Sequence, residues 1–94
     1  MAMFVMLGKY SSGSVKGISA ERTRQAEELI TRLGGRVQSV CAMLGPYDLL
    51  LIVEFPDVKQ AMKASLGLAQ LTDIAFTTCP AVSVEEFDQL AAEV

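Results

Sequence analysis

Acidic and phenolic side chains interrupt the apolar segment LGPYDLLLIVEFPD, which covers residues 44 to 57. Tyr47 and Asp48 follow the Gly45-Pro46 pair, which is typical of a turn, and they precede a run of apolar residues. An aspartate at a turn commonly accepts hydrogen bonds from backbone N–H groups, which would give Asp48 a structural role. In the alternative interpretation, the phenol and the carboxylate line the mouth of a pocket and bind a polar ligand.

Glu54 is the one charged residue in the apolar run that follows this turn. Because side chains alternate along a strand, Glu54 shares a face with Leu50 and Ile52. A carboxylate among such neighbours either finds a cationic partner or has its pKa raised by desolvation. Three interpretations stay open: an ion pair with Lys9 or Arg36, a solvated position at the strand end, or a general base in a cavity of the open sheet face.

Basic residues surround the small-residue segment SSGSVKG, residues 11 to 17. Lys9 precedes the segment, Lys16 lies within it, and Arg22 follows it near the start of a predicted helix. Free N–H groups at that helix N-terminus, together with these cations, could hold a carboxylate or a phosphate, whereas solvated surface charges are the alternative. Tyr10 is a further candidate as a hydrogen-bond donor. The segment lacks the spacing of a phosphate-binding P-loop.

The chain has two cysteines and no histidine. The absence of histidine removes most zinc sites, histidine-based catalytic triads and histidine acid–base chemistry. Cys41 and Cys79 are expected to be buried apolar thiols rather than a disulfide, because cytosolic thiols stay reduced. We therefore predict no metal and no cofactor.

The composition predicts one small domain that associates with a partner. With 94 residues there is no room for a second core, so residues 1 to 94 are expected to form a single domain. Hydrophobic residues make up 51% of the chain and charged residues 20%, an apolar excess for a protein of this size. Such an excess favours burial of part of the surface by another molecule.

The charge and hydropathy pattern exclude two classes of partner. The net charge of −3 and the scattered basic residues argue against nucleic acid, which is bound mainly through clustered Lys and Arg. No apolar run reaches the roughly 18–20 residues that span a membrane. The N-terminal residues lack the basic region of a signal peptide, so we interpret them as a strand and expect a cytoplasmic protein.

Apolar spacing and capping residues predict four strands and three helices. The predicted strands cover residues 3–10, 36–44, 49–55 and 73–82. The predicted helices follow the capping residues Ser19, Asp57 and Ser83 and end near Leu33, Gly67 and Ala92. The segment from residue 11 to 17 is predicted to be a loop.

The order of these elements predicts a ferredoxin-like α+β fold, βαββαβ with a short C-terminal helix. Its four-stranded antiparallel sheet carries both main helices on one face. On the third strand, Leu49, Leu51 and Val53 lie on one face and Leu50 and Ile52 on the other, so both faces are apolar. Two helices cover only one of them. We therefore expect a second copy to pack sheet against sheet, with a covering loop as the alternative.

The GPYD turn, the apolar strand after it and the EFPD sequence at its end resemble the GYD-domain family of small bacterial proteins. Softer matches occur at Lys9, 16–18, Arg22, 34–35 and 83–87, so the resemblance spans nearly the whole chain. It implies a dimeric α/β-barrel assembly of ferredoxin-like subunits and supplies no established activity. The pattern is also similar to the effector-binding domains of Lrp/AsnC regulators, which bind amino acids between subunits, but this chain has no helix-turn-helix.

These observations favour an oligomeric small-molecule-binding or sensing protein. Its ligand would be a small anionic metabolite held near Lys9, Tyr47, Asp48 and Glu54, with the pocket between sheet and helices or between subunits. The alternative is a cofactor-independent monooxygenase or isomerase of the dimeric-barrel type, with Glu54 or Asp48 as base and Tyr10 or Tyr47 as donor. A third possibility is a structural oligomer without a pocket.

Overall fold

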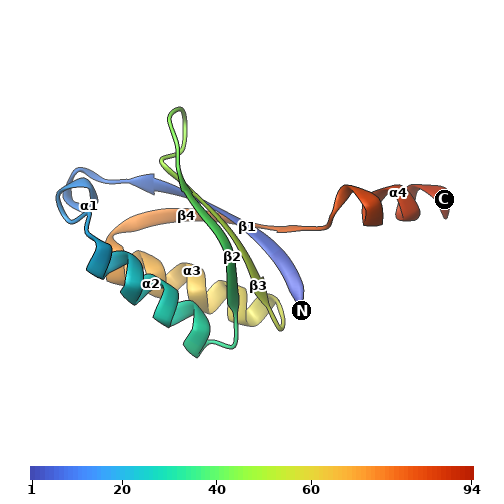
Figure 1. The fold of residues 1–94 in the computed structure, drawn as a ribbon, viewed down its shortest axis with the longest axis horizontal. Coiled ribbons are helices and arrows are strands. Elements are labelled where there is room, and N and C mark those ends of the chain that lie inside the picture. The colour runs from blue at the N-terminus through green and yellow to red at the C-terminus, as the bar shows by residue number, and fades with distance from the viewer.

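A computed structural model describes residues 1–94 and shows one twisted antiparallel sheet with helices against it (Figure 1). The strands are β1 (Ala2–Tyr10), β2 (Arg36–Ala42), β3 (Leu49–Phe55) and β4 (Ile74–Ala81). The helices are α1 (Ser12–Lys16), α2 (Ala20–Arg32), α3 (Val58–Thr72) and α4 (Val84–Ala92). The strand order is β2-β3-β1-β4, which confirms the predicted ferredoxin-like α+β fold.

One face of the sheet forms the hydrophobic core against α2 and α3. Burial alternates along the two central strands, as the period of two requires, so that every second side chain points towards the helices. The buried cluster combines these side chains with others from both helices: Phe4, Met6, Ile30, Leu51, Val53, Phe55, Ala61, Ala64 and Leu68. Both predicted faces of the third strand are therefore assigned correctly.

The opposite face of the sheet, which we call the open face, has no helix over it (Figure 1). Val5, Leu7, Leu50 and Ile52 lie next to each other on this face and remain partly exposed. In a single chain, neighbouring side chains cover part of their surface, but no helix covers the rest.

Both cysteines are exposed, so the expectation of buried thiols is wrong for the single chain. Cys79 pairs with Val5 across β4 and β1, and Cys41 pairs with Leu50 across β2 and β3. This register places both thiols on the open face. Their exposure thus has the same cause as that of their apolar neighbours, because no element covers that side.

Two segments differ from the prediction by more than two residues. Residues 12–16 form the short helix α1 instead of a loop, because Ser11 and Ser14 make a reciprocal capping box. Helix α3 continues past Gly67 to Thr72 and ends where Asp73 takes the left-handed conformation with φ 57°. Gly67 is placed where α2 comes close, since a Cβ there would lie 2.9 Å from a methyl carbon of Leu29. Close helix packing therefore offsets its poor helix propensity.

The two outer strands of the sheet, β2 and β4, are both irregular. The pairing of β2 with β3 shifts register between Val37 and Ser39, which leaves Gln38 in a bulge. Strand β4 contains Pro80, which lies opposite Phe4 of β1. Proline has no backbone N–H, so such a position is compatible only with the edge of a sheet.

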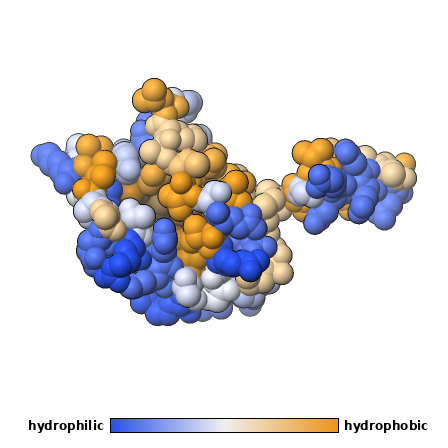
Figure 2. All heavy atoms as spheres, viewed as in Figure 1, coloured by the Kyte–Doolittle hydropathy of each residue, from blue (hydrophilic) through white to orange (hydrophobic).

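Helix α4 stands apart from the rest of the molecule. It follows β4 after two residues and projects beyond the end of the sheet (Figure 1). None of its residues is buried, and Figure 2 shows hydrophobic and hydrophilic surface together on this separate arm.

Candidate functional site

A cavity of about 80 Å³ lies between α2 and the helix-facing side of the sheet. Its inner wall consists of five buried side chains from four elements: Ile30, Leu51, Leu68, Thr72 and Ile74. Partly exposed residues line the middle: Tyr10, Arg22, Ala26, Leu49 and Phe76. Exposed residues form the rim: Ile18, Ser19, Thr23, Glu27 and Val40. The cavity is therefore mainly apolar inside, and its polar lining residues other than Thr72 lie towards the opening.

Arg22 and Tyr10 form the polar side of this cavity. The guanidinium carbon of Arg22 lies 5.9 Å from the centre of the Tyr10 ring, within the range of a cation–π interaction. Arg22 Nη1 also donates a hydrogen bond to the carbonyl oxygen of Ser14, at 2.6 Å. A guanidinium has five N–H donors, so this contact fixes the group and leaves donors for a ligand.

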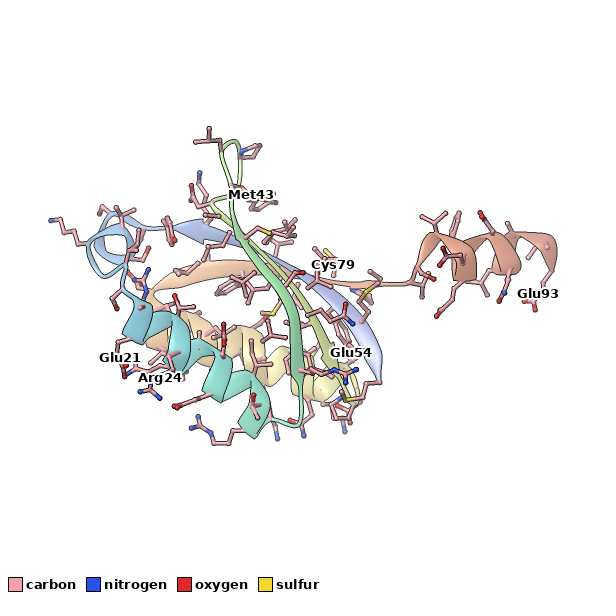
Figure 3. The ribbon with its side chains drawn as sticks, viewed as in Figure 1. Glu21, Arg24, Met43, Glu54, Cys79 and Glu93 are labelled. Carbon is pink, nitrogen blue, oxygen red and sulfur yellow. The ribbon has the colours of Figure 1, made fainter.

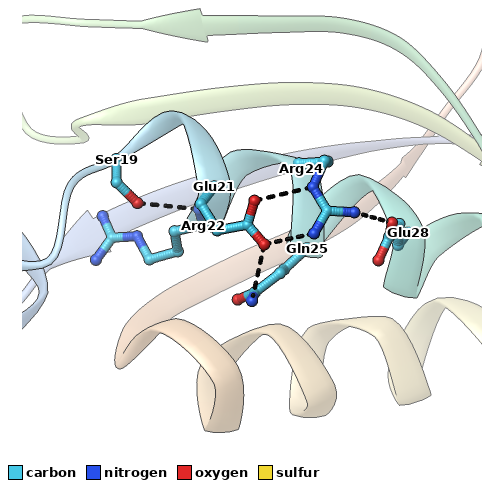
Figure 4. Close-up of polar contacts among 6 residues, drawn as sticks. All are labelled: Ser19, Glu21, Arg22, Arg24, Gln25 and Glu28. Atoms are coloured by element: carbon cyan, nitrogen blue, oxygen red, sulfur yellow. Dashed lines mark hydrogen bonds and ion pairs between the residues drawn. The ribbon is translucent and has the colours of Figure 1, made fainter.

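The first turn of α2 positions Arg22. The side-chain oxygen of Ser19 accepts a hydrogen bond from the backbone N–H of Arg22 at 3.0 Å, which caps the helix (Figure 4). The cap fixes where the helix begins and so directs the third residue of the helix towards the cavity. Ser14 is itself buried, which gives the arginine a rigid acceptor.

Arg24 lies on the solvent side of α2, does not line the cavity, and pairs with two glutamates. Its Nε donates to Glu21 Oε2 at 3.0 Å, and its Nη1 pairs with Glu28 one turn further on (Figure 4). The hydrogen bond from Arg24 lowers the pKa of Glu21, and the same contact raises the pKa of Arg24. All three side chains are exposed, so this cluster supports the helix weakly. Arg24 is therefore a matched control for Arg22 on the same helix.

Asp48 holds the end of β1. Its Oδ2 accepts a hydrogen bond from the backbone N–H of Tyr10 at 2.8 Å. Its own N–H donates to the carbonyl oxygen of Gly8 at 2.8 Å, and its carbonyl oxygen accepts from the N–H of Met43 at 2.9 Å. The carboxylate of Asp48 thus accepts a hydrogen bond from backbone, which is the structural role considered for it from the sequence. Tyr47, beside it, is partly exposed and lines no cavity.

Glu54, labelled in Figure 3, forms an ion pair with Arg36 on the neighbouring strand. Arg36 Nε donates to Glu54 Oε2 at 2.8 Å, and the two residues are direct neighbours in the register of β2 and β3. The hydrogen bond from Arg36 holds the pKa of Glu54 below its usual value, with a smaller contribution from Gln38. Glu54 therefore lacks the raised pKa that was expected of a desolvated general base. Of the three interpretations of Glu54, the structure contains the ion pair with Arg36.

The structure does not bring the predicted site residues together. Glu54 pairs with Met3 near the start of β1, whereas Lys9 lies at the far end of that strand. Lys9 and Lys16 are exposed, and Lys9 lines a separate hollow that also contains Asp73. Of the seven candidates, only Tyr10 and Arg22 line the cavity under α2.

Comparison with known protein families identifies the chain. The model of the GYD domain matches residues 4–91, which is nearly the whole sequence. The chain belongs to the GYD domain family. No curated protein and no solved structure is significantly similar to this GYD domain. None of its helices is both long and apolar enough to cross a membrane, and no three His, Cys, Asp or Glu side chains are grouped so as to hold a metal ion.

Several cavity residues of this GYD domain were missed by reasoning from the sequence. Ser19, Thr23, Glu27 and Ile30 follow each other at spacings of three to four residues and so share one side of α2 with Arg22. That spacing was a usable signal, because it separates the cavity side of the helix from the Arg24 side. The contributions of β4 carried no comparable signal, since they depend on how the helix packs across the sheet.

Proposed function

We propose that this GYD domain is a cytoplasmic small-molecule-binding or sensing module that holds a small carboxylate in the cavity under α2. The observation that carries the proposal is the pairing of an apolar, enclosed wall with a fixed arginine at the opening. Ligand sites typically combine such a lining with a few polar groups that set orientation. Arginine suits a carboxylate because two of its N–H groups match the two carboxylate oxygens.

The dimensions of the cavity limit the ligand. A cavity of about 150 Å³ is known to hold benzene, so the 80 Å³ found here suits a molecule of only a few heavy atoms. The apolar part of such a ligand would contact Leu51, Ile74 and Phe76, and its carboxylate would reach Arg22 and Tyr10. Glu27 on the rim disfavours dianions and would tolerate an amino group on the ligand.

The enzyme alternative receives less support. Its base candidates lie outside the cavity, since Glu54 is paired with Arg36 at a lowered pKa and Asp48 binds backbone N–H. The cavity does contain the phenol of Tyr10, but Glu27 is the only carboxylate around it and lies on the exposed rim. Binding without turnover agrees best with this set of groups.

We also propose that two copies pair through their open faces. The support is the set of contiguous apolar side chains on β1 and β3 that no element of the chain covers. Native mass spectrometry at several concentrations tests this pairing. We expect a discrete oligomer that loses subunits in the variant Ile52→Asp. A wild-type protein that stays monomeric, or a subunit count that this variant leaves unchanged, would overturn the pairing.

Binding is tested by calorimetry and thermal unfolding with the series formate, acetate, propionate and butyrate, with propionamide as the uncharged reference. We expect an affinity that rises with chain length until the cavity is full, and stabilisation of about 2.7 kcal/mol at one hundred times Kd. The variant Arg22→Gln should lose the binding, whereas Arg24→Gln on the same helix should keep it. If no carboxylate stabilises the protein, or if both variants behave alike, the assignment of this cavity is wrong.

A further inference from the structure

Helix α4 has an apolar stripe that is exposed along its length. Val84, Phe87 and Leu90 recur every three residues, so they lie along one side of the helix. Phe87 is 62% exposed and Leu90 is 52% exposed, although both are among the larger apolar side chains of the protein. A two-turn amphipathic helix does not persist in water by propensity alone, so this stripe requires a partner surface.

A surface of matching character lies along α3, on the helix side of the sheet. Val58, Met62 and Leu66 recur every four residues and are each more than half exposed. They border a hollow of about 530 Å³, which we call the α3 groove, and its remaining lining residues are Phe4, Ala61, Ser65, Thr78 and Pro80. The groove is open and predominantly apolar, and no element of the chain fills it.

The charges of the two helices are complementary. The last eleven residues of the chain contain four of its eleven acidic residues, Glu85, Glu86, Asp88 and Glu93, and none of its eight basic residues. Helix α3 has Lys59 and Lys63 and no acidic residue. By helical spacing, both lysines lie next to the side of α3 that carries Leu66. An acidic amphipathic helix placed in the α3 groove would thus have cations beside it.

We propose that α4 of one copy binds in the α3 groove of a second copy. Ser83 has the extended conformation (φ −65°, ψ 158°), so the chain continues past the end of β4 and carries α4 away from its own groove (Figure 1). The binding mode is an amphipathic helix in an apolar groove, with Val84, Phe87 and Leu90 as anchors. In a two-fold pair, each copy both gives an arm and receives one. Because the groove lies on the helix side of the sheet, this contact does not depend on the open face or on the cavity under α2.

The chain contains no tryptophan, so Phe87→Trp introduces a single fluorescent reporter into the arm. In this variant we expect emission that is shifted to the blue, because the indole is buried in a groove. Adding Met62→Asp should abolish the shift, since it places a charge in the groove at a position that is 60% exposed and so is tolerated by the fold. The matched control adds Leu44→Asp, which alters a fully exposed apolar residue in the hairpin between β2 and β3 and should leave the shift unchanged.

Mixing distinguishes a second copy from the chain's own groove. One chain carries Phe87→Trp and Met62→Asp, so that its arm is intact and its groove is spoiled. The other carries only Phe87→Asp, so that its arm is spoiled, its groove is intact and it has no tryptophan. We expect the first chain alone to emit at long wavelength and to shift to the blue when the second is added.

Three results would overturn the proposal. If the Phe87→Trp variant shows the blue shift but mixing the two chains does not restore it, α4 folds back onto its own chain. Long-wavelength emission from the Phe87→Trp variant at every concentration would mean that α4 does not bind a second copy. Loss of the shift in the Leu44→Asp control as well would mean that the contact is not specific to the α3 groove.

Discussion

Removal of the Asp48 carboxylate tests the contact that holds the end of β1 next to the cavity. In Asp48→Ala the partly buried N–H of Tyr10 loses its acceptor, a hydrogen bond of 2.8 Å to a charged group. Hydrogen bonds to charged groups contribute roughly 1.5–3 kcal/mol, so we expect a loss of about 2 kcal/mol in the free energy of unfolding. For a domain of this size, each kcal/mol shifts Tm by about 4–8 °C, which gives a decrease of roughly 8–16 °C.

Asp48→Asn refines this prediction because it keeps the acceptor oxygen and removes only the charge. A neutral hydrogen bond contributes about 1 kcal/mol, so the stability of this variant should lie between those of the wild type and Asp48→Ala. Urea unfolding followed by far-UV circular dichroism measures all three proteins, with Glu93→Ala as the control for loss of an exposed carboxylate. A loss below about 0.5 kcal/mol for Asp48→Ala, or equal losses for the two variants, would refute this account of Asp48.

Three further predictions follow from other contacts. Gly35→Ala should lower the free energy of unfolding by about 1–3 kcal/mol in urea titrations, because the new Cβ would lie 2.5 Å from the fully buried ring of Phe55; unchanged stability would show that the ring can move. The pKa of Glu54 is lowered in the folded state, so its ion pair stabilises the protein above the unfolded pKa of about 4.3 and this stabilisation is lost as the pH falls through the folded pKa. The difference in stability between wild type and Glu54→Gln, measured by urea unfolding at a series of pH values, should therefore shrink on acidification, and a constant difference would contradict the ion pair. Cys41 and Cys79 should react with Ellman's reagent at dilution and more slowly as the protein is concentrated, since both lie on the open face; a rate independent of concentration would argue against pairing through that face.

Local patterns were sufficient to predict the fold. Alternation along β1 and β3 identified the buried and open faces, and the caps at Ser19, Asp57 and Ser83 marked where three helices begin. The ion pair of Glu54 was also among the expected outcomes, because neighbouring strands bring opposite charges together. These features depend on spacings of a few residues or on the pairing of adjacent strands.

The candidate site was much harder to predict, because it depends on long-range placement. Asp48 reaches Tyr10 across 38 residues of sequence, and no local pattern indicates which backbone N–H it meets. The cavity under α2 is lined by residues that lie far apart in the sequence, on both main helices and on all four strands, and side-chain periodicity does not specify how these elements meet. The four candidates expected around one ligand failed as a group because Lys9 and Glu54 lie at opposite ends of paired strands.

The irregular outer strands have a consequence for aggregation by strand addition. A sheet with regular edges invites further strands, and a chain with so much uncovered apolar surface would be prone to ribbon-like aggregation. The bulge at Gln38 distorts the pattern of donors and acceptors on β2, and Pro80 withholds one donor on β4. Growth by strand addition is thus obstructed at both edges. Straightening β2 by deleting Gln38, or restoring a donor with Pro80→Thr, would be expected to make the protein form fibrils more readily.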